Sequence, residues 1–289
     1  MPDDIRTIAL IGPLADDRDN ILGAWRSNAK AKDAISLLEG LKSRVGPGTK
    51  ILHTKGCKIN DTDKSGFRQA IAHAQKANIV LMAVGESADM SGEAHSRSFI
   101  GLPGIQLELI KEIYKTGKPV VLILMNGRPL AIQWENEHIP AILECWQLGT
   151  EAGNSISDVL FGDYNPSGKL VTSFPQTTGQ IPIYYNHKNT GRPGTGDDRF
   201  NSKYIDTPID PLFPFGFGLS YTSFQYLHLS LSTDTISMDE TLEVKVTVRN
   251  TGKYPGEEIV QLYLRDVFAS VTRPVKELKG FEKIVIINM

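Results

Sequence analysis

The chain has 289 residues, of which 40% are hydrophobic and 22% charged, and its 31 basic and 33 acidic residues leave a formal net charge of −2. This balance lacks the basic surplus of proteins that bind nucleic acids or membrane surfaces. No apolar run approaches the roughly 20 residues of a membrane-spanning helix, so the composition predicts a folded globular protein whose ligand is a neutral small molecule or another protein.

The first 164 residues alternate between two kinds of segment. The apolar runs are Thr7–Ile11, Ile51–Thr54, Ile79–Val84, Val120–Leu124 and Ala141–Trp146, and the amphipathic helical stretches are Ala29–Arg44, Ser65–Lys76, Gly104–Lys115 and Glu151–Phe161. Continuously apolar strands separated by helices are typical of a parallel sheet covered on both faces. Residues 1–164 are therefore predicted to form a doubly wound α/β sandwich, in which ligands bind beyond the carboxyl ends of the strands.

Residues 165–220 form a long irregular stretch that begins with Asn165–Gly168 and includes Pro208–Pro214. The stretch is too rich in proline, glycine and aromatic residues to be a disordered linker. We expect an ordered strap that packs over the sandwich.

Residues 221–289 have the pattern of a β domain. Apolar and polar residues alternate strictly from Leu242 to Arg249, Asn250–Lys253 supplies a turn, and Ile259–Leu264 supplies the next strand. This pattern predicts that the two strands pair as a half-buried antiparallel hairpin. A sandwich of the fibronectin type III kind needs about 100 residues, so we expect a truncated, incomplete fibronectin III-like β-sandwich.

One loop carries the residues best suited to chemistry. The segment 84–97 follows the third apolar run and contains the carboxylates of Glu86, Asp89 and Glu93 together with His95 and Arg97. Glycoside hydrolysis needs two carboxyl groups on either side of the bond that breaks, one of them protonated to donate to the leaving oxygen. A loop at the carboxyl end of a strand can place one such acid in a cleft, and Gly92 gives this loop flexibility. By itself the pattern also fits a solvated acidic loop.

Other chemistries find no support in the residue pattern. Asp61–Gly66 opens like a calcium loop, but the position that should hold a bidentate glutamate is Ala72, and a helix cap explains the cluster better. No glycine-rich phosphate loop, no spaced histidine pair and no serine nucleophile elbow occurs, so no cofactor and no metal is predicted. Cys57 and Cys145 lie in or beside apolar runs and are expected to be buried thiols.

From Thr7 to Ile284 the chain resembles the C-terminal half of family 3 glycoside hydrolases of the periplasmic β-glucosidase type. Seven motifs carry the resemblance and occur in the family's order. They are 8–15 (IALIGPLA), 85–97 (GESADMSGEAHSR), 126–130 (NGRPL), 149–153 (GTEAG), 160–170 (LFGDYNPSGKL), 213–221 (FPFGFGLSY) and 273–281 (RPVKELKGF).

The resemblance implies a retaining, exo-acting β-glucosidase whose active site lies between this sandwich and an N-terminal (β/α)₈ barrel. In such enzymes the barrel supplies the aspartate nucleophile, which this chain lacks, and the sandwich loop supplies the general acid/base. Glu93 matches the position of that acid/base, with Glu86 and Asp89 as its rivals because the loop varies in length. Arg97 is expected either to bind substrate or to pair with Glu93 or Asp89.

The resemblance also implies the partners of this chain, which are a β-glucoside or oligosaccharide substrate and the barrel, with neither nucleic acid nor membrane. Without the barrel we expect no activity from the chain alone. The alternative interpretation is a non-catalytic module that docks onto a separate barrel or binds carbohydrate. The compartment is not evident from these residues, and the family implies the periplasm or secretion.

Overall fold

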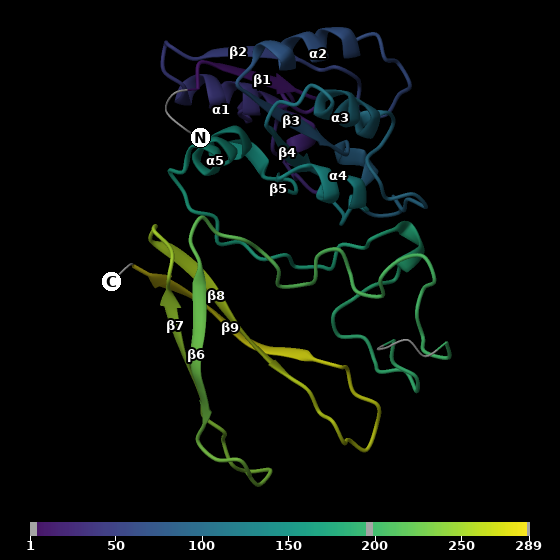
Figure 1. The fold of residues 1–289 in the computed structure, drawn as a ribbon, viewed down its shortest axis with the longest axis vertical. Helices are drawn as coiled ribbons and strands as arrows, with labels where there is room; N and C mark the ends of the chain where they lie inside the picture. Colours follow the sequence, from purple (N-terminus) through teal and green to yellow (C-terminus); the bar gives the residue numbers. More distant parts are fainter. Residues whose placement is uncertain (1–4, 195–198, 288–289) are drawn as a thin grey trace. The chain divides into compact units, whose positions relative to one another are not determined.

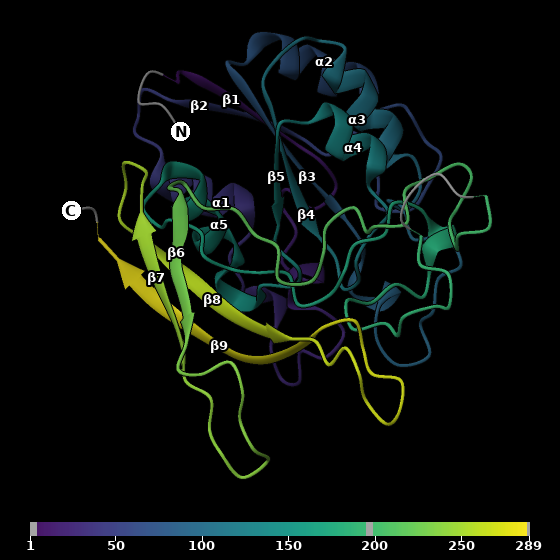
Figure 2. The same cartoon turned by 60° about the horizontal axis from the view of Figure 1, so that its bottom comes forward.

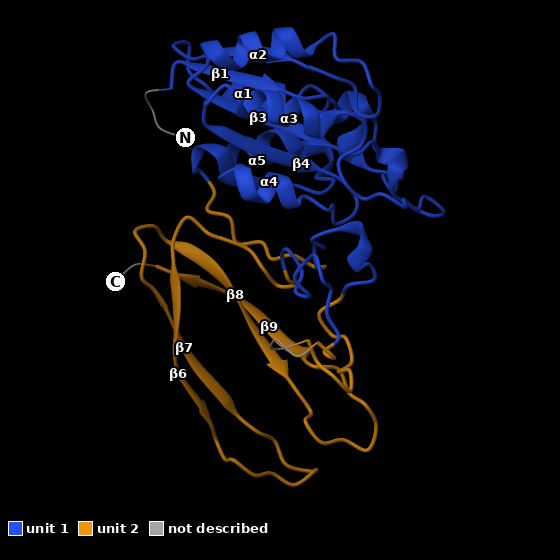
Figure 3. Ribbon diagram, turned by 45° about the vertical axis from the view of Figure 1, so that its right-hand side comes forward, with its two compact units in different colours: residues 1–163, 173–183, 202–213 blue, residues 164–172, 184–201, 214–289 orange. Residues whose placement is uncertain are grey.

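The computed structural model describes residues 5–194 and 199–287, and the chain divides into two compact units (Figure 3). Unit 1 comprises residues 1–163, 173–183 and 202–213, and unit 2 comprises residues 164–172, 184–201 and 214–289. The predicted strap 165–220 therefore contributes to both units, and domain boundaries at 164 and 220 stay a prediction. Among the described residues, no helix has the length and apolar character that a membrane span requires.

Unit 1 is built on a five-stranded parallel sheet in the order β2-β1-β3-β4-β5 (Figure 1). The strands are β1 (Thr7–Ile11), β2 (Lys50–Thr54), β3 (Ile79–Gly85), β4 (Val120–Met125) and β5 (Ala141–Glu144). Their Val, Ile and Leu side chains suit a pleated surface that is buried on both sides, and β1, β3 and β4 are almost fully buried. The predicted doubly wound sandwich is confirmed.

Helices cover both faces of this sheet, with α1 and α5 on one side and α2, α3 and α4 on the other (Figure 2). The helices are α1 (Leu37–Arg44), α2 (Phe67–Lys76), α3 (Gln106–Tyr114), α4 (Gln133–His138) and α5 (Ala152–Phe161). Alternate strand residues such as Ile8 and Leu10 pack against α1 and α5 in one core of buried side chains. The first helix begins later than predicted because Ser36 and Glu39 form a capping box at its start, and α4 was not predicted.

The strand order determines where a ligand can approach. From β1 the chain crosses to β2 on one side and then to β3 on the other, so the direction of winding reverses between β1 and β3. In doubly wound sheets, ligands bind outside the carboxyl ends of the strands at such a reversal. The loop that begins at Gly85 leaves β3 at this edge.

Unit 2 contains two separate antiparallel pairs, β6 (Phe224–Leu231) with β7 (Val244–Asn250) and β8 (Gly256–Leu264) with β9 (Glu277–Ile286). A mostly buried ion pair fastens an earlier segment to them, since Lys169 Nζ lies 3.0 Å from Glu258 Oε2. The Tyr226 hydroxyl donates to the other oxygen of Glu258 at 2.8 Å. Burial is the main reason that the pKa of Tyr226 is raised, and its hydrogen bond to Glu258 adds to the effect.

The predicted hairpin between residues 242–249 and 259–264 is wrong. The first of these segments pairs with β6 and the second with β9. Asn250 explains the difference, because its side-chain oxygen accepts from the Thr222 hydroxyl at 2.6 Å and from Gly252 N at 3.1 Å. The turn is thus fastened to the segment before β6 and carries the chain from one sheet to the other.

Candidate functional site

The candidate site is the loop that follows β3. Its first residues continue the sheet, because Glu86 N donates to the carbonyl of Met125 at 2.9 Å. The Gln106 side chain, at the start of α3, accepts from Gly85 N at 2.9 Å and donates to the Gly85 carbonyl at 2.7 Å. The beginning of the loop is therefore held by both the neighbouring strand and the following helix.

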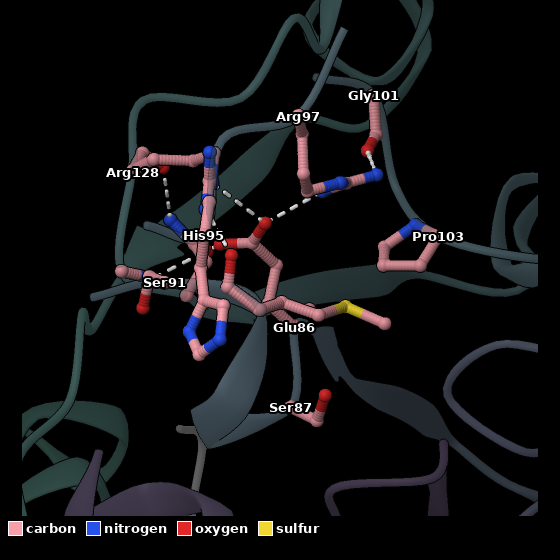
Figure 4. Close-up of polar contacts among 12 residues, drawn as sticks. Glu86, Ser87, Ser91, His95, Arg97, Gly101, Pro103 and Arg128 are labelled. Carbon is pink, nitrogen blue, oxygen red and sulfur yellow. Dashed lines mark hydrogen bonds and ion pairs between the residues drawn. The ribbon is translucent and has the colours of Figure 1, made fainter. Parts of the chain in front are cut away.

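Glu86 is buried within a set of donors. Its side chain is fully inaccessible, Arg97 Nη1 lies 2.6 Å and Arg128 Nε 2.9 Å from its Oε1, and the two guanidinium groups approach the carboxylate from two sides (Figure 4). Gly127 N donates to its Oε2 at 3.2 Å. A carboxylate enclosed in this way is a structural anion, since a substrate could reach it only after two ion pairs had broken.

Glu93 lies at the outer end of the same loop, seven positions after Glu86, and is exposed to solvent. It sits in a turn with two left-handed residues, Gly92 at φ +132° and Ala94 at φ +61°. Within the part of the chain that the structure describes, no side-chain hydrogen bond or ion pair of Glu93 occurs. Its carboxyl group is accordingly free to meet a ligand.

Arg97 and Asp89 take roles different from those expected. The predicted pairing of Arg97 with Glu93 or Asp89 is wrong, because Arg97 pairs with Glu86 and its Nη2 donates to the Gly101 carbonyl at 3.0 Å. Asp89 is exposed and accepts from the hydroxyl of Ser87. A substrate-binding role for Arg97 stays a prediction. Its guanidinium group already contacts two protein acceptors, Glu86 and the Gly101 carbonyl.

Glu144 is a further carboxyl group near this cluster, at the end of β5. Its Oε1 accepts from Trp146 N at 2.9 Å, and Asn126 Nδ2 lies 3.4 Å from its Oε2. Burial is the main reason that the pKa of Glu144 rises to about 8, with the negative charge of Glu86 as a lesser contribution. Glu144 is therefore mostly protonated at neutral pH.

Sequence reasoning overlooked Arg128 and Glu144. The motif NGRPL served only as a mark of the resemblance, whereas Arg128 contacts Glu86 and bonds the carbonyls of Met90 and His95. Arg128 lies three positions after the end of β4 at Met125, and Glu144 is the last residue of β5, which is the next strand in the sheet. That signal, a charged residue at or just after the end of a strand, was present in the sequence.

Trp146 and the two cysteines have surroundings that the structure describes. Trp146 is partly buried, and its ring contacts that of Phe174, with centroids 5.7 Å apart. Cys57 and Cys145 are free and buried, as predicted. No group of three or more potential metal ligands comes together among the residues described.

Two families match the sequence. The Glycosyl hydrolase family 3 C-terminal domain matches residues 1–221, and the Fibronectin type III-like domain matches residues 258–288. The first match covers most of the chain and includes the whole of the loop described above.

Individual relatives agree with these matches. The chain is 46% identical to a periplasmic beta-glucosidase of Salmonella typhimurium over 97% of its own length, and 43% identical to a beta-xylosidase of Formosa agariphila over 98%. Among solved structures, a beta-glucosidase from Listeria innocua in complex with glucose is similar over 98% of the chain, with 44% identity and a TM-score of 0.91. The chain spans only 40%, 39% and 39% of these three proteins.

Proposed function

The chain belongs to glycosyl hydrolase family 3, and from this premise we propose that it forms the C-terminal portion of a retaining, exo-acting β-glucosidase. Its contribution to catalysis is the general acid/base Glu93. The nucleophile comes from an N-terminal (β/α)₈ barrel. In support, this chain spans only 40% of the Salmonella relative, which leaves room for such a domain.

The observation that carries this proposal is the contrast between the two glutamates of the loop. Glu86 is inaccessible and is held by Arg97 and Arg128, whereas Glu93 is exposed on a turn at the ligand-binding edge of the sheet. An acid/base must reach the glycosidic oxygen and exchange its proton with water. Glu93 meets both conditions, and Glu86 meets neither.

The chemistry requires a change in the surroundings of Glu93. In a retaining enzyme the acid/base and the nucleophile lie about 5–5.5 Å apart, and the acid/base first protonates the leaving oxygen and then deprotonates the attacking water. An exposed carboxyl group is mostly ionised at neutral pH. Packing of a barrel against the loop would exclude water from the site, and burial favours the neutral, proton-donating form of a carboxyl group.

A terminal β-D-glucosyl residue is the proposed substrate, because the Salmonella and Listeria relatives are named beta-glucosidases. The Formosa relative is named a beta-xylosidase, so a β-xyloside is the substrate to compare. The proposed compartment is the periplasm or the exterior of the cell, in keeping with the name of the Salmonella relative.

The test joins this chain to the N-terminal portion of the Salmonella relative, giving a hybrid enzyme. We expect the chain alone to hydrolyse aryl β-glucosides no faster than buffer, because the proposed nucleophile lies in the barrel, and the hybrid enzyme to be active. Glu93→Ala in the hybrid should lower turnover by about 10²–10⁴-fold. Added azide should restore much of this turnover for substrates with a good leaving group, since the nucleophile is still present.

Glu86→Ala is the matched control, because it removes a carboxylate from the same loop. It should lower the stability of the hybrid, and azide should not rescue its activity. Rescue of the Glu86 variant instead of the Glu93 variant would move the acid/base to Glu86. Turnover by the chain alone that disappears with Glu93→Gln, or an inactive folded hybrid, would contradict the proposed division of the catalytic residues.

A further inference from the structure

Arg128 bonds the loop on both sides of Glu93. One terminal nitrogen of its guanidinium group, Nη2, donates to the carbonyl of Met90 and, at 2.8 Å, to the carbonyl of His95. Four residues, Ser91 to Ala94, lie between these two carbonyls, and Glu93 is among them. A single side chain from another segment thus closes the base of the turn that carries Glu93.

The direction of the Arg128 side chain is itself determined by buried partners. Its Nε lies 2.9 Å from Glu86 Oε1, and the side chain is only 18% exposed. Asn126 Nδ2 donates to the Arg128 carbonyl at 2.9 Å, which holds the backbone of the same motif. Because Glu86 is anchored to Gly127 N as well, the guanidinium group has little freedom to point elsewhere.

The preceding glycine brings this motif close to the loop. A Cβ atom at Gly127 would overlap the Ser91 side chain, whose hydroxyl also lies 3.3 Å from Gln147 Nε2. Only a residue without a side chain lets the backbone at 127 and Ser91 come this near. Figure 4 shows Arg128, Ser91 and His95 on the same side of Glu86.

The turn needs such support because its backbone adopts a conformation that is unfavourable for one of its residues. Ala94 has φ +61°, a left-handed conformation that is unfavourable for a residue with a Cβ atom. Residues in such conformations persist where the surrounding structure holds them, and this is common at functional sites. The two carbonyl contacts of Arg128 provide that hold.

We propose that Arg128 is a positioning residue for Glu93, acting through the carbonyls of Met90 and His95 to keep the acid/base turn in the conformation that donates a proton. This inference rests on the proposed function of Glu93. A lysine can pair with Glu86 or bond a carbonyl, but it lacks the planar array of donors needed to do both at once. Arg128→Lys therefore keeps the positive charge and removes the geometry.

The test compares two substrates in the hybrid enzyme. The kcat/KM of a retaining enzyme reports the first step, in which the acid protonates the leaving group. Dinitrophenolate is a good leaving group and departs without being protonated, whereas methanol needs a proton from the acid in order to leave. We expect Arg128→Lys to lower kcat/KM for methyl β-glucoside by about 10- to 100-fold, the range for a misplaced catalytic group. For 2,4-dinitrophenyl β-glucoside the loss should stay within about twofold, because that step does not use the acid.

Arg44→Lys is the matched control. Arg44 also pairs with a carboxylate, since its Nε and Nη2 lie 2.5 and 2.8 Å from the oxygens of Asp163, but this pair is not part of the loop. It should leave the ratio of the two kcat/KM values unchanged. That ratio does not depend on the fraction of folded enzyme, so a loss of stability cannot imitate the effect.

Each outcome decides the proposal. Equal losses for both substrates, or no loss, would make Arg128 a structural residue only. If Arg128→Lys does not fold, the double variant Glu86→Gln/Arg128→Gln, which removes one charge of each sign, replaces it with the same expected ratio. If Glu93→Ala leaves the ratio of the two kcat/KM values unchanged, the proposed function of Glu93 is wrong. If Glu93→Ala changes this ratio and Arg128→Lys does not, only the positioning role of Arg128 is wrong.

The chain alone offers a second readout. The His95 amide donates to the Gly92 carbonyl at 3.3 Å, so its hydrogen exchange should become faster in Arg128→Lys, while the amides of β3 and β4 keep their protection. Unchanged exchange of the turn would contradict the proposed hold.

Discussion

The two ends of the loop after β3 place a glutamate in opposite environments, one buried and one exposed. We call Gly85–Ser87 the loop root and Gly92–Ala94 the loop tip. The root places Glu86 in a buried site with two guanidinium groups and a backbone N–H, and the tip leaves Glu93 exposed. The difference teaches that burial and partners, rather than residue type, separate a structural carboxylate from one available for chemistry.

Glu86→Ala should produce the largest change in stability. Removing the carboxylate leaves Arg97 and Arg128 facing each other with no anion between them, and breaking a buried ion pair from one side costs about 3–5 kcal/mol. The same substitution at Glu93 should change the free energy of unfolding by no more than about 0.5 kcal/mol, as at other exposed sites. Urea titrations of the two variants measure the contrast.

A loss at Glu93→Ala equal to that at Glu86→Ala would remove the distinction between root and tip. Arg97→Met serves as a second measurement at the root, since it removes one of the two cations and leaves Glu86 paired with Arg128 alone. It should cost less than Glu86→Ala because the remaining buried charges still balance.

Glu144 extends the comparison, because it lies near the root and is mostly protonated in the folded chain at neutral pH. Burial raises its pKa to about 8 from the ordinary value of 4.5. Between these values the unfolded chain releases the proton and the folded chain keeps it, so the free energy of unfolding falls as pH rises, by up to about 1.4 kcal/mol per pH unit. Below this window the group is protonated in both states, and above it the group is ionised in both.

Glu144→Gln should remove this dependence, since an amide does not titrate. We expect the variant to match the parent chain at low pH and to become the more stable of the two as the pH approaches 8. Urea midpoints measured at several pH values give the difference. A difference that stays constant with pH, or that favours the parent chain at high pH, would show that Glu144 is ionised in the folded protein.

The smallest effect is expected at the tip. Ala94 adopts φ +61°, which costs a residue with a Cβ atom about 1–2 kcal/mol relative to glycine. Ala94→Gly relieves this strain but adds about 0.4–1 kcal/mol of conformational entropy to the unfolded chain. The net result should be a gain of at most about 1 kcal/mol in stability, measured by urea titration.

The same substitution at Ala88 is the matched control for the tip. Ala88 begins the 3-10 turn Ala88–Met90 in the same loop and does not have a positive φ. Ala88→Gly should therefore lose about 0.5–1 kcal/mol. Equal effects at the two positions would mean that the turn at Ala94 is not strained.

Much of the fold could be predicted because it depends on local patterns. The five strands of unit 1 show as apolar runs, and α2, α3 and α5 show the helical period. The prediction was wrong where pairing depends on residues far apart, as for β7 and β8, whose partners are β6 and β9. The alternation of apolar residues indicates a strand but does not identify the strand that pairs with it.

The sequence by itself determined the class of the protein, its parallel sheet and the loop that carries three carboxylates. Only the tertiary structure decided which carboxylate is buried and which arginine holds it. Glu86 and Arg128 are 42 positions apart in the sequence, and they meet because β3 and β4 are neighbours whose parallel register brings Gly85 opposite Met125. Such ion pairs form between the ends of adjacent strands, so they depend on the order of strands in the sheet, which no local pattern of residues encodes.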